Sequence, residues 1–343
     1  MLTAHGDLGL RVFSTCPPSS GATRDVYLRQ VQEIALWSEK AGCEGILVYT
    51  DNAQVDPWLT SELIINATRT LCPLVAVQPV YMHPYSVAKM VTSLAFLHGR
   101  RVYLNMVAGG FTNDLAALND RTPHDERYAR LAEYTAIILG LLQSPEPLTF
   151  SGSYYQVQNL RLTPALPPEF MPGVLMSVSS EAGVQTARRL GAIPVEYPKP
   201  APECAEASPG VGASRGLRIG IIARDTEAEA WRDAHGRFPP DRKGQLTHEL
   251  AMKLSDSSWH RQLSKLGAKG APEQERNPYW LVPFENYKTF CPYLVGSYAT
   301  VAQSIAGYVN AGYRTFILDV PSSPEELRHT GIVFGLAVGR LAA

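Results

Sequence analysis

The chain has 343 residues, of which 45% are hydrophobic and 18% are charged. This composition is typical of a globular protein and excludes disorder, collagen and coiled coil. The 31 basic and 32 acidic residues leave a net charge of −1, so the chain lacks the positive field that would hold nucleic acid or an anionic membrane surface. We therefore expect a small-molecule ligand, with no nucleic acid and no membrane as partner.

The N-terminus and the cysteines predict a cytoplasmic protein. The first residues show neither a basic region nor a long apolar run, so no secretion signal is visible. The five cysteines are scattered without the C-x-x-C spacing of zinc or redox sites, and we expect them to be reduced. The eight histidines form no H-E-x-x-H motif or close pair, so no metal site is predicted.

Short β-branched segments alternate with longer amphipathic segments along the whole chain. Strands are predicted at 10–14, 44–49, 74–77, 102–107, 174–178, 193–196, 217–223 and 313–320. Helices are predicted from 27 to the stop at Gly42, from Pro57 after the capping residue Asp56, and at 84–97, 126–142, 180–191, 227–234 and 299–310. Residues 150–162 predict a hairpin outside the main sheet, 199–216 a loop where a helix is expected, and 238–294 a long insertion.

Eight strands alternating with helices predict an α/β fold, a (β/α)8 TIM barrel formed by residues 1–343 as a single domain. The first strand is not followed by a G-x-G-x-x-G turn, which argues against a dinucleotide-binding fold. The insertions include a long lid between strands seven and eight. Because barrel enzymes carry their chemistry at the carboxyl ends of the strands, the site is expected there.

Polar residues follow several of the predicted strands. The pair Ser179-Ser180 stands before a helix and could hold a phosphate with hydroxyl and backbone N–H groups, or could be a plain helix cap. Gly109, in a Gly-Gly pair, would let the backbone approach a flat ligand or form an ordinary turn. His124 could contact a ligand or cap its helix. Arg218, inside an apolar strand, needs an anionic partner, which could be a substrate or a structural carboxylate.

Motifs of other enzyme classes are missing from the sequence. There is no G-x-S-x-G elbow for a serine nucleophile and no G-x-x-x-x-G-K-[ST] loop for a nucleotide phosphate. Hydrolysis and phosphoryl transfer are therefore not favoured.

A series of motifs carries a family resemblance. They are Gln78-Pro79 with His83-Pro84, His98-Gly99-Arg100-Arg101, the stretch from Asn105 to Gly110, His124-Asp125-Glu126-Arg127-Tyr128, Ser179-Ser180-Glu181, Arg224-Asp225-Thr226 and Leu294-Val295-Gly296-Ser297. Together they resemble the bacterial luciferase-like flavin-dependent monooxygenases, with the alkanesulfonate monooxygenase branch nearest. The resemblance runs from about residue 25 to the C-terminus.

The resemblance implies a barrel that binds reduced FMN (FMNH2) from a separate NAD(P)H-dependent flavin reductase and reacts it with O2. The resulting C4a-peroxyflavin would oxygenate the substrate, while the protein supplies orientation and a dry cavity. Carried over by position, the cofactor-binding residues are Thr50, Asp51, Gln54, Asn105, Gly109, Tyr128, Ser179 and Ser180, the serines holding the phosphate. Arg218 and His124 are the catalytic candidates. A homo-oligomer, dimer or tetramer, is also expected.

The chain departs from the alkanesulfonate branch at several positions. The cysteine of that branch after strand two is Gln54 here, its strand-seven histidine falls on Gly220, and its tyrosine after strand eight falls on Pro321. Its arginine-bearing loop is replaced by 282–293, which carries four aromatic side chains and one lysine. These changes predict poor desulfonation and an aromatic or polycyclic natural-product substrate, as in antibiotic biosynthesis, unless the rings merely pack this segment onto the protein.

Three other functions stay open. The chain could be an alkanesulfonate-type desulfonating monooxygenase despite the missing residues. It could use a deazaflavin for hydride transfer on the same fold. It could also be a non-catalytic flavin-binding relative, as Gly220 and Pro321 would allow.

Overall fold

The computed structural model describes residues 2, 8–109, 112–201, 214–253 and 277–342. The chain divides into two compact units. The central unit comprises Cys16–Ala35 and Gly45–Pro194, and the C-terminal unit comprises Met1–Thr15, Leu36–Glu44 and Val195–Ala343. Helix α1 (Arg24–Ala41) contributes residues to both units.

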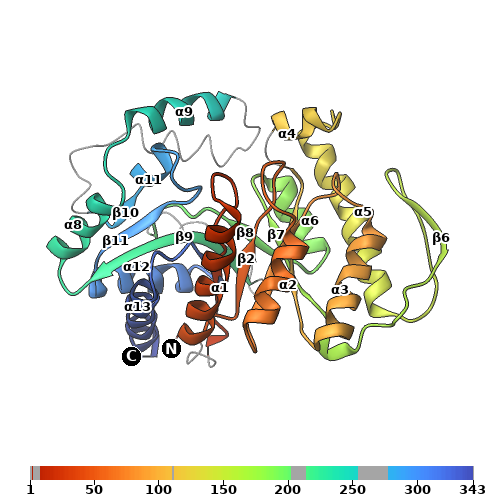
Figure 1. Cartoon of the computed structure of the whole chain (residues 1–343), viewed down its shortest axis with the longest axis horizontal. Helices are drawn as coiled ribbons and strands as arrows, with labels where there is room; N and C mark the ends of the chain where they lie inside the picture. Colours follow the sequence, from red (N-terminus) through yellow and green to blue (C-terminus); the bar gives the residue numbers. More distant parts are fainter. Residues whose placement is uncertain (1, 3–7, 110–111, 202–213, 254–276, 343) are drawn as a thin grey trace. The chain divides into compact units, whose positions relative to one another are not determined.

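A parallel sheet forms the middle of the central unit. Its strands lie in the order β2 (Gly45–Val48), β3 (Cys72–Val77), β4 (Tyr103–Val107) and β7 (Gly173–Ser177). The helices are α2 (Pro57–Ala67), α3 (Pro84–His98), α4 (Thr112–Ala117), α5 (His124–Gln143) and α6 (Glu181–Arg189), and a 3-10 turn spans Pro168–Phe170. Helices α3 and α5 pack against each other (Figure 1). The interior of this unit is apolar, with Leu104, Met106, Leu131 and Met176 fully buried.

Capping residues set the helix boundaries in this unit. The Asp56 carboxylate accepts hydrogen bonds from the backbone N–H groups of Trp58 (2.9 Å) and Leu59 (3.2 Å), and Pro57 is the first residue of α2. Helix α3 ends at Gly99, whose left-handed backbone (φ 59°) suits a residue without a side chain. The Arg100 guanidinium then donates to the carbonyl oxygen of Thr68 (2.7 Å), just beyond the last turn of α2. The hydrogen bonds of Asp56 and the position of Pro57 confirm the predicted start of α2.

The predicted hairpin is also confirmed. Strands β5 (Leu148–Ser151) and β6 (Gln156–Leu160) form an antiparallel sheet of their own beside α5 (Figure 1). Glu133 of α5 fixes the turn between them, because its carboxylate accepts hydrogen bonds from the N–H groups of Ser153 (2.8 Å), Tyr154 (2.8 Å) and Tyr155 (3.1 Å). A Cβ at Gly152 would lie 2.3 Å from this carboxylate, so a larger residue there would displace the Glu133 carboxylate from the turn.

The C-terminal unit also has four parallel strands. They lie in the order β8 (Ile193–Glu196), β9 (Arg215–Arg224), β12 (Tyr313–Leu318) and β1 (Arg11–Thr15). Two further strands extend this sheet, with β11 (Tyr293–Ser297) parallel to β9 and β10 (Tyr279–Trp280) antiparallel to β11. The helices are α8 (Glu227–Arg237), α9 (Arg242–Lys253), α11 (Val282–Glu285), α12 (Tyr298–Asn310) and α13 (Pro324–Ala342).

Eight parallel strands, four in each unit, alternate with helices, and this is the (β/α)8 TIM-barrel fold class that the sequence predicts. The prediction of one domain over residues 1–343 stays a prediction.

The predicted insertion at 238–294 is wrong at its end, because Tyr293 and Leu294 already belong to β11. The reason lies in β9, which has ten residues and extends beyond the predicted strand at 217–223 at both ends. Its first half pairs with β12, while Gly220–Arg224 pairs with Tyr293–Ser297 and so satisfies its backbone groups. Strand β12 ends at Leu318, two residues before the predicted end. Most of the predicted loop at 199–216 lies outside the described residues.

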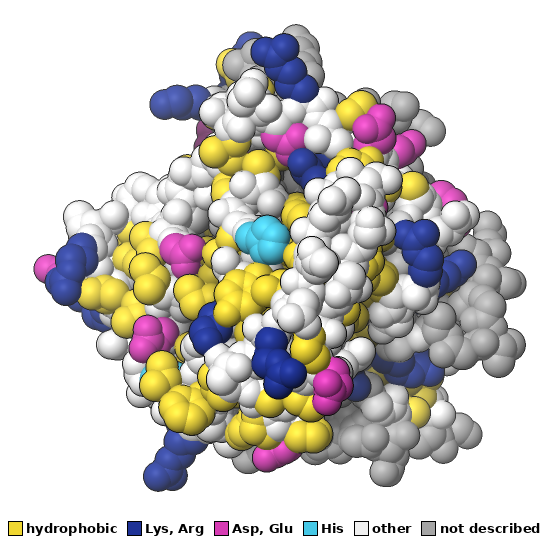
Figure 2. Space-filling model, turned by 90° about the vertical axis from the view of Figure 1, so that its right-hand side faces the viewer, with side chains coloured by type: hydrophobic (Ala, Val, Ile, Leu, Met, Phe, Trp, Pro, Cys, Tyr) yellow, Lys and Arg dark blue, Asp and Glu magenta, His cyan; other side chains and the backbone are white. Residues whose placement is uncertain are grey.

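Figure 2 shows one face of the molecule, on which hydrophobic side chains reach the surface. On α3 the exposed apolar residues are Met90, Phe96 (75% exposed) and Leu97 (68% exposed). Apolar exposure of this kind at the surface of one helix favours association with another protein surface.

Candidate functional site

Four predicted site residues meet at the N-terminus of α6. Ser180 is the N-cap of this helix, and its hydroxyl accepts the Gly183 N–H at 3.4 Å. The neighbouring Ser179 hydroxyl lies 3.3 Å from Tyr128 Oη and 3.4 Å from His124 Nε2, and the Ser179 N–H donates to Tyr128 Oη at 3.1 Å. Tyr128 and His124 both come from the start of α5. The fold thus brings together residues that are more than 50 positions apart in the sequence.

The close approach of α5 to α6 depends on a glycine. A Cβ at Gly183 would lie 2.8 Å from the Tyr128 ring, so a larger residue would push the tyrosine away from Ser179. His124 is held from its other side, because its Nδ1 lies 2.9 Å from Asp125 Oδ1. Its second ring nitrogen, Nε2, therefore faces the Ser179 hydroxyl.

This cluster has the chemistry of a phosphate site. Hydroxyl groups of Ser179, Ser180 and Tyr128 converge with an imidazole on the N-terminus of a nine-residue helix. The first N–H groups of a helix and its dipole favour an anion at this end. The residues present therefore fit the phosphate of a mononucleotide such as FMN.

Two further predicted residues lie near the ends of neighbouring strands. Asn105 of β4 is buried, and its side-chain oxygen accepts a hydrogen bond from the Ser177 hydroxyl of β7 at 3.0 Å. Gly109 follows β4 with φ +105°, a backbone conformation that favours glycine. A Cβ there would lie 3.1 Å from Leu115 and 3.6 Å from Gln78 Oε1. These residues place a buried amide and a glycine backbone segment near the carboxyl end of β4.

A cavity of about 420 Å³ lies in the same unit, beyond the ends of β2 and β3. Its lining includes Thr50, Asp51, Gln54, Trp58, Gln78 and Tyr81. Gln54 is tied to a loop, since its side-chain oxygen accepts hydrogen bonds from the backbone N–H (2.7 Å) and hydroxyl (3.0 Å) of Ser19. Burial, together with the carboxylates of Asp114 and Asp51, raises the pKa of Tyr81 to about 12. Tyr81 is therefore a neutral hydrogen-bonding group at physiological pH.

Arg218 belongs to the C-terminal unit, where a structural carboxylate lies near it. Its Nη2 is 3.8 Å from Asp319 Oδ1, just beyond the end of β12. The other oxygen of Asp319 accepts a hydrogen bond from Tyr293 Oη at 2.7 Å. Of the two partners expected for Arg218, the structure provides the carboxylate.

Tyr293 also explains the glycine at position 220. The tyrosine ring lies beside Gly220, and a Cβ at this position would be 2.3 Å from the ring. The Tyr293 side chain of β11 therefore fills the space that a side chain at position 220 of β9 would occupy. Burial and the neighbouring Asp319 raise the pKa of Tyr293 well above its ordinary value, so its hydroxyl stays protonated.

The aromatic side chains of 282–293 pack largely onto the protein. Phe284 and Tyr293 are buried, and the Phe284 ring lies 4.6 Å from the ring of His248 in edge contact. Tyr287 and Phe290 are half-buried and contact each other, with ring centroids 5.8 Å apart. For Phe284 and Tyr293 the structure thus favours the packing alternative.

Sequence reasoning missed several residues of these sites. Gln78 and Tyr81 line the cavity, and Asp319 and Tyr293 surround Arg218. Gln78 and Asp319 each follow a strand directly, so the rule that finds Thr50 and Ser179 would also have found them. Tyr293 carries no such signal, because its strand was not predicted.

Neither a metal-binding cluster nor a membrane-spanning helix occurs in the described part of the chain. No group of three or more His, Cys, Asp or Glu side chains there could hold a metal ion. Within the same residues, no helix is long and apolar enough to cross a membrane.

Comparison with known proteins identifies relatives over nearly the whole chain. The family of luciferase-like monooxygenases matches residues 10–315. The 4-(gamma-L-glutamylamino)butanoyl-[BtrI acyl-carrier protein] monooxygenase BtrO of Niallia circulans is 33% identical over 309 residues, which cover 88% of this chain and 89% of that protein.

Solved structures agree with this result at the level of the fold. A riboflavin lyase structure (RcaE) with modified FMN and riboflavin has a TM-score of 0.74 at 18% identity, covering 97% of this chain and 92% of that one. An F420-dependent secondary alcohol dehydrogenase has a TM-score of 0.67 at 14% identity, covering 96% and 100%. At such low identities the likeness shows the fold alone.

Proposed function

Because the chain belongs to the luciferase-like monooxygenase family, and is thus a flavin-dependent monooxygenase, we propose that it works as one part of a two-component system. A separate NAD(P)H-dependent flavin reductase supplies reduced FMN. The enzyme binds this flavin and uses O2 to oxygenate a small organic substrate.

The cluster at the N-terminus of α6 is the observation that carries this proposal. Ser179, Ser180, Tyr128 and His124 form a donor set for one phosphate, and FMN carries one phosphate. From there the ribityl chain would lead toward Asn105 and Gly109, which would face the ring. Thr50, Asp51 and Gln54 line the cavity assigned to the mouth of the flavin site.

When bound, the reduced flavin would supply the electrons that activate O2. The protein holds the ring in place and excludes water. We assign His124 and Arg218 as the catalytic candidates. One ring nitrogen of His124 lies beside Asp125 and the other faces the Ser179 hydroxyl, where it would contact the bound cofactor. Arg218, held near Asp319, would orient an anionic or polar group of the substrate.

The substrate is the finer part of the proposal. The missing sulfonate-binding residues favour an aromatic or polycyclic molecule, and short alkanesulfonates should be poor substrates. Sulfite release from octanesulfonate at about 1 s⁻¹ or faster, a rate typical of working enzymes, would contradict this expectation. A second candidate is an acyl group tethered to a carrier protein. It is favoured by the 33% identity to a monooxygenase whose name gives such a substrate.

Purification and cofactor titration test the proposal. The isolated protein should contain little flavin and should bind reduced FMN more tightly than oxidised FMN. With a generic flavin reductase and NADPH it should consume O2 in the presence of substrate. A fully yellow protein that oxidises NADPH by itself would contradict the two-component scheme. Binding of a reduced deazaflavin in preference to reduced FMN would instead support hydride transfer, and flavin binding without turnover would support a non-catalytic relative.

Two properties of the whole molecule complete the proposal. We expect a homo-oligomer, dimer or tetramer, and the exposed Phe96 and Leu97 of α3 support association of this surface. We also expect a cytoplasmic location, where NAD(P)H and the reductase are found.

A further inference from the structure

A second cavity with a positively charged lining lies in the C-terminal unit, remote in sequence from the proposed flavin residues. It has a volume of about 340 Å³ and lies beside the end of β9, with α8 and the start of α13 contributing to its wall. The charged and polar residues that line it are Arg224, Arg232, Asp233, Arg237, Ser322 and Glu326. Arginine thus outnumbers carboxylate in this wall.

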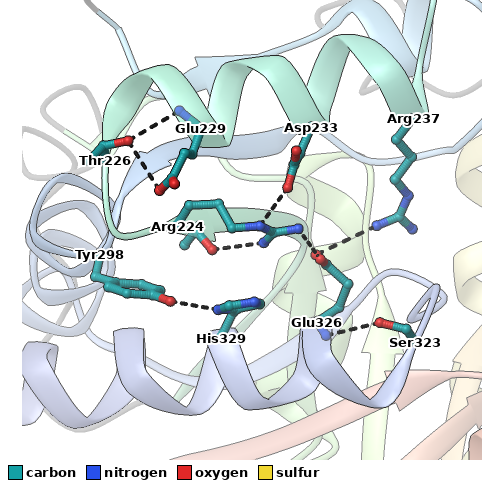
Figure 3. Close-up of polar contacts among 10 residues, drawn as sticks. Arg224, Thr226, Glu229, Asp233, Arg237, Tyr298, Ser323, Glu326 and His329 are labelled. Carbon is teal, nitrogen blue, oxygen red and sulfur yellow. Dashed lines mark hydrogen bonds and ion pairs between the residues drawn. The ribbon is translucent and has the colours of Figure 1, made fainter.

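Arg224 contacts both carboxylates of this wall. Its Nε lies 2.7 Å from Asp233 Oδ2, and its Nη2 bonds to Glu326 Oε1, as Figure 3 shows. Its Nη1 donates to the carbonyl oxygen of Ala223 at 2.8 Å. The donors of Arg224 are therefore used within the protein, and the three arginines of the wall exceed its two carboxylates by one charge.

Arg232 and Arg237, both on α8, keep donors for a ligand. Arg237 donates through Nη2 to the carbonyl oxygen of Val320 at 3.0 Å, and its guanidinium lies over the Phe238 ring, 5.1 Å from the centroid. Its Nη1 is 4.0 Å from Glu326 Oε2, too far for a hydrogen bond. The Arg237 guanidinium is thus held in place beside Glu326, while its Nη1 is too far from that carboxylate to use its donors on it. Arg232 is exposed and forms no ion pair with a described carboxylate.

The N-terminus of α13 adds to the same wall. Ser323 caps this helix, because its hydroxyl accepts the Glu326 N–H at 3.3 Å, and Ser322 precedes it in the cavity lining (Figure 3). A helix N-terminus favours an anion. In TIM barrels, the loops after strands seven and eight frequently form a phosphate site, and here β9 and β12 are those strands.

We propose that this cavity binds a phosphoryl group carried by the substrate, held by Arg232, Arg237, Ser322 and the N-terminus of α13. Two guanidinium groups, a hydroxyl and a helix end suit a tetrahedral anion with several oxygens better than a carboxylate with two. The source is the phosphopantetheine arm of a carrier protein or a small phosphorylated molecule. The first source rests on the carrier-protein substrate considered under the proposed function.

Calorimetric titration of the full chain tests the proposal. A background variant with Ser179→Ala and Ser180→Ala weakens the FMN phosphate site, so that the remaining binding reports mainly on this cavity. The probes are inorganic phosphate, 4′-phosphopantetheine and pantetheine. Both phosphorylated probes should bind and pantetheine should not. Tighter binding of 4′-phosphopantetheine than of phosphate assigns the carrier arm, and equal binding assigns a small phosphorylated molecule.

Matched variants connect the binding to this cavity. Arg232→Gln should weaken phosphate binding about fivefold or more, because a charge-assisted contact is lost, and Arg232→Lys should recover most of it. Arg24→Gln removes a guanidinium whose side chain is 82% exposed on α1 and should change nothing. The proposal is overturned if the background variant binds no phosphate, or if Arg24→Gln weakens binding as much as Arg232→Gln. Because these titrations need neither flavin nor turnover, their failure is distinct from failure of the proposed function.

Discussion

Replacing Ser179 and Ser180 together by alanine separates a phosphate site from a simple helix cap. If both hydroxyls donate to the FMN phosphate, the double variant loses two hydrogen bonds to a charged group. Such a loss costs about 1 to 3 kcal/mol of binding free energy, a rise in Kd of roughly 5-fold to 150-fold. The variant should still fold, because the cap bond from Gly183 N–H to Ser180 is long, at 3.4 Å, and its loss costs about 1 kcal/mol of stability or less.

Riboflavin and a matched cap variant make the result specific. Riboflavin has the same ring and side chain as FMN but no phosphate, so its Kd should be the same in the wild type and in the double variant. Ser297→Ala removes an equivalent cap from α12, where the Ser297 hydroxyl accepts the Thr300 N–H at 3.2 Å. It should lower stability similarly without changing FMN affinity. Anaerobic titration of reduced FMN and riboflavin, with unfolding in urea, gives these quantities. An unchanged FMN affinity, or an equal loss for riboflavin, would refute the phosphate assignment.

Three further predictions concern stability. Glu133→Gln should lower the free energy of unfolding in urea by about 1 to 3 kcal/mol, because the Glu133 carboxylate accepts hydrogen bonds from three backbone N–H groups of the hairpin turn. Glu126 is exposed, so Glu126→Gln should have little effect. Although burial opposes it, hydrogen bonds from Arg130 and Thr122 lower the pKa of Asp120 from 3.8 to about 2. The ionised Asp120 therefore contributes about 2 kcal/mol to the free energy of unfolding above pH 4, and this contribution is lost as the pH falls toward 2. The difference in stability between the wild type and Asp120→Asn should shrink over that range. A difference that does not depend on pH would contradict the assignment. Gly220→Ala should lower the free energy of unfolding by about 1 to 3 kcal/mol, because the added Cβ would press against the Tyr293 ring. In a Tyr293→Ala background the same change should lower it by less. Additive effects of the two substitutions would contradict this contact.

Local signals in the sequence determined much of the fold. The alternation of apolar strands with amphipathic helices predicts the (β/α)8 class, because burial requires periods of about two and 3.6 residues. Asp56 with Pro57 predicts the start of α2, and the break in rhythm at residues 150–162 predicts the β5–β6 hairpin. These features depend on neighbouring residues alone.

The ends of the strands also located part of the candidate site. Thr50, Asn105 and Ser179 stand at or near the carboxyl ends of predicted parallel strands, and the family resemblance assigns them to the flavin site. The structure places Ser179 with Tyr128 and His124, and Thr50 with Gln78. The sequence alone left Ser180 equally suited to a helix cap, since the same hydroxyl serves either role.

Only the tertiary structure decided the contacts between distant segments. Strand β11 pairs with the second half of β9 and so satisfies its backbone hydrogen-bonding groups. The sequence of residues 293–297 does not by itself predict this pairing. Tyr293 then fills the space at Gly220 and binds Asp319 beside Arg218. Likewise, the arginines of α8 meet the start of α13 through residues about 90 positions apart. Such contacts depend on strand register and helix packing, which the periodicity of a single segment does not contain.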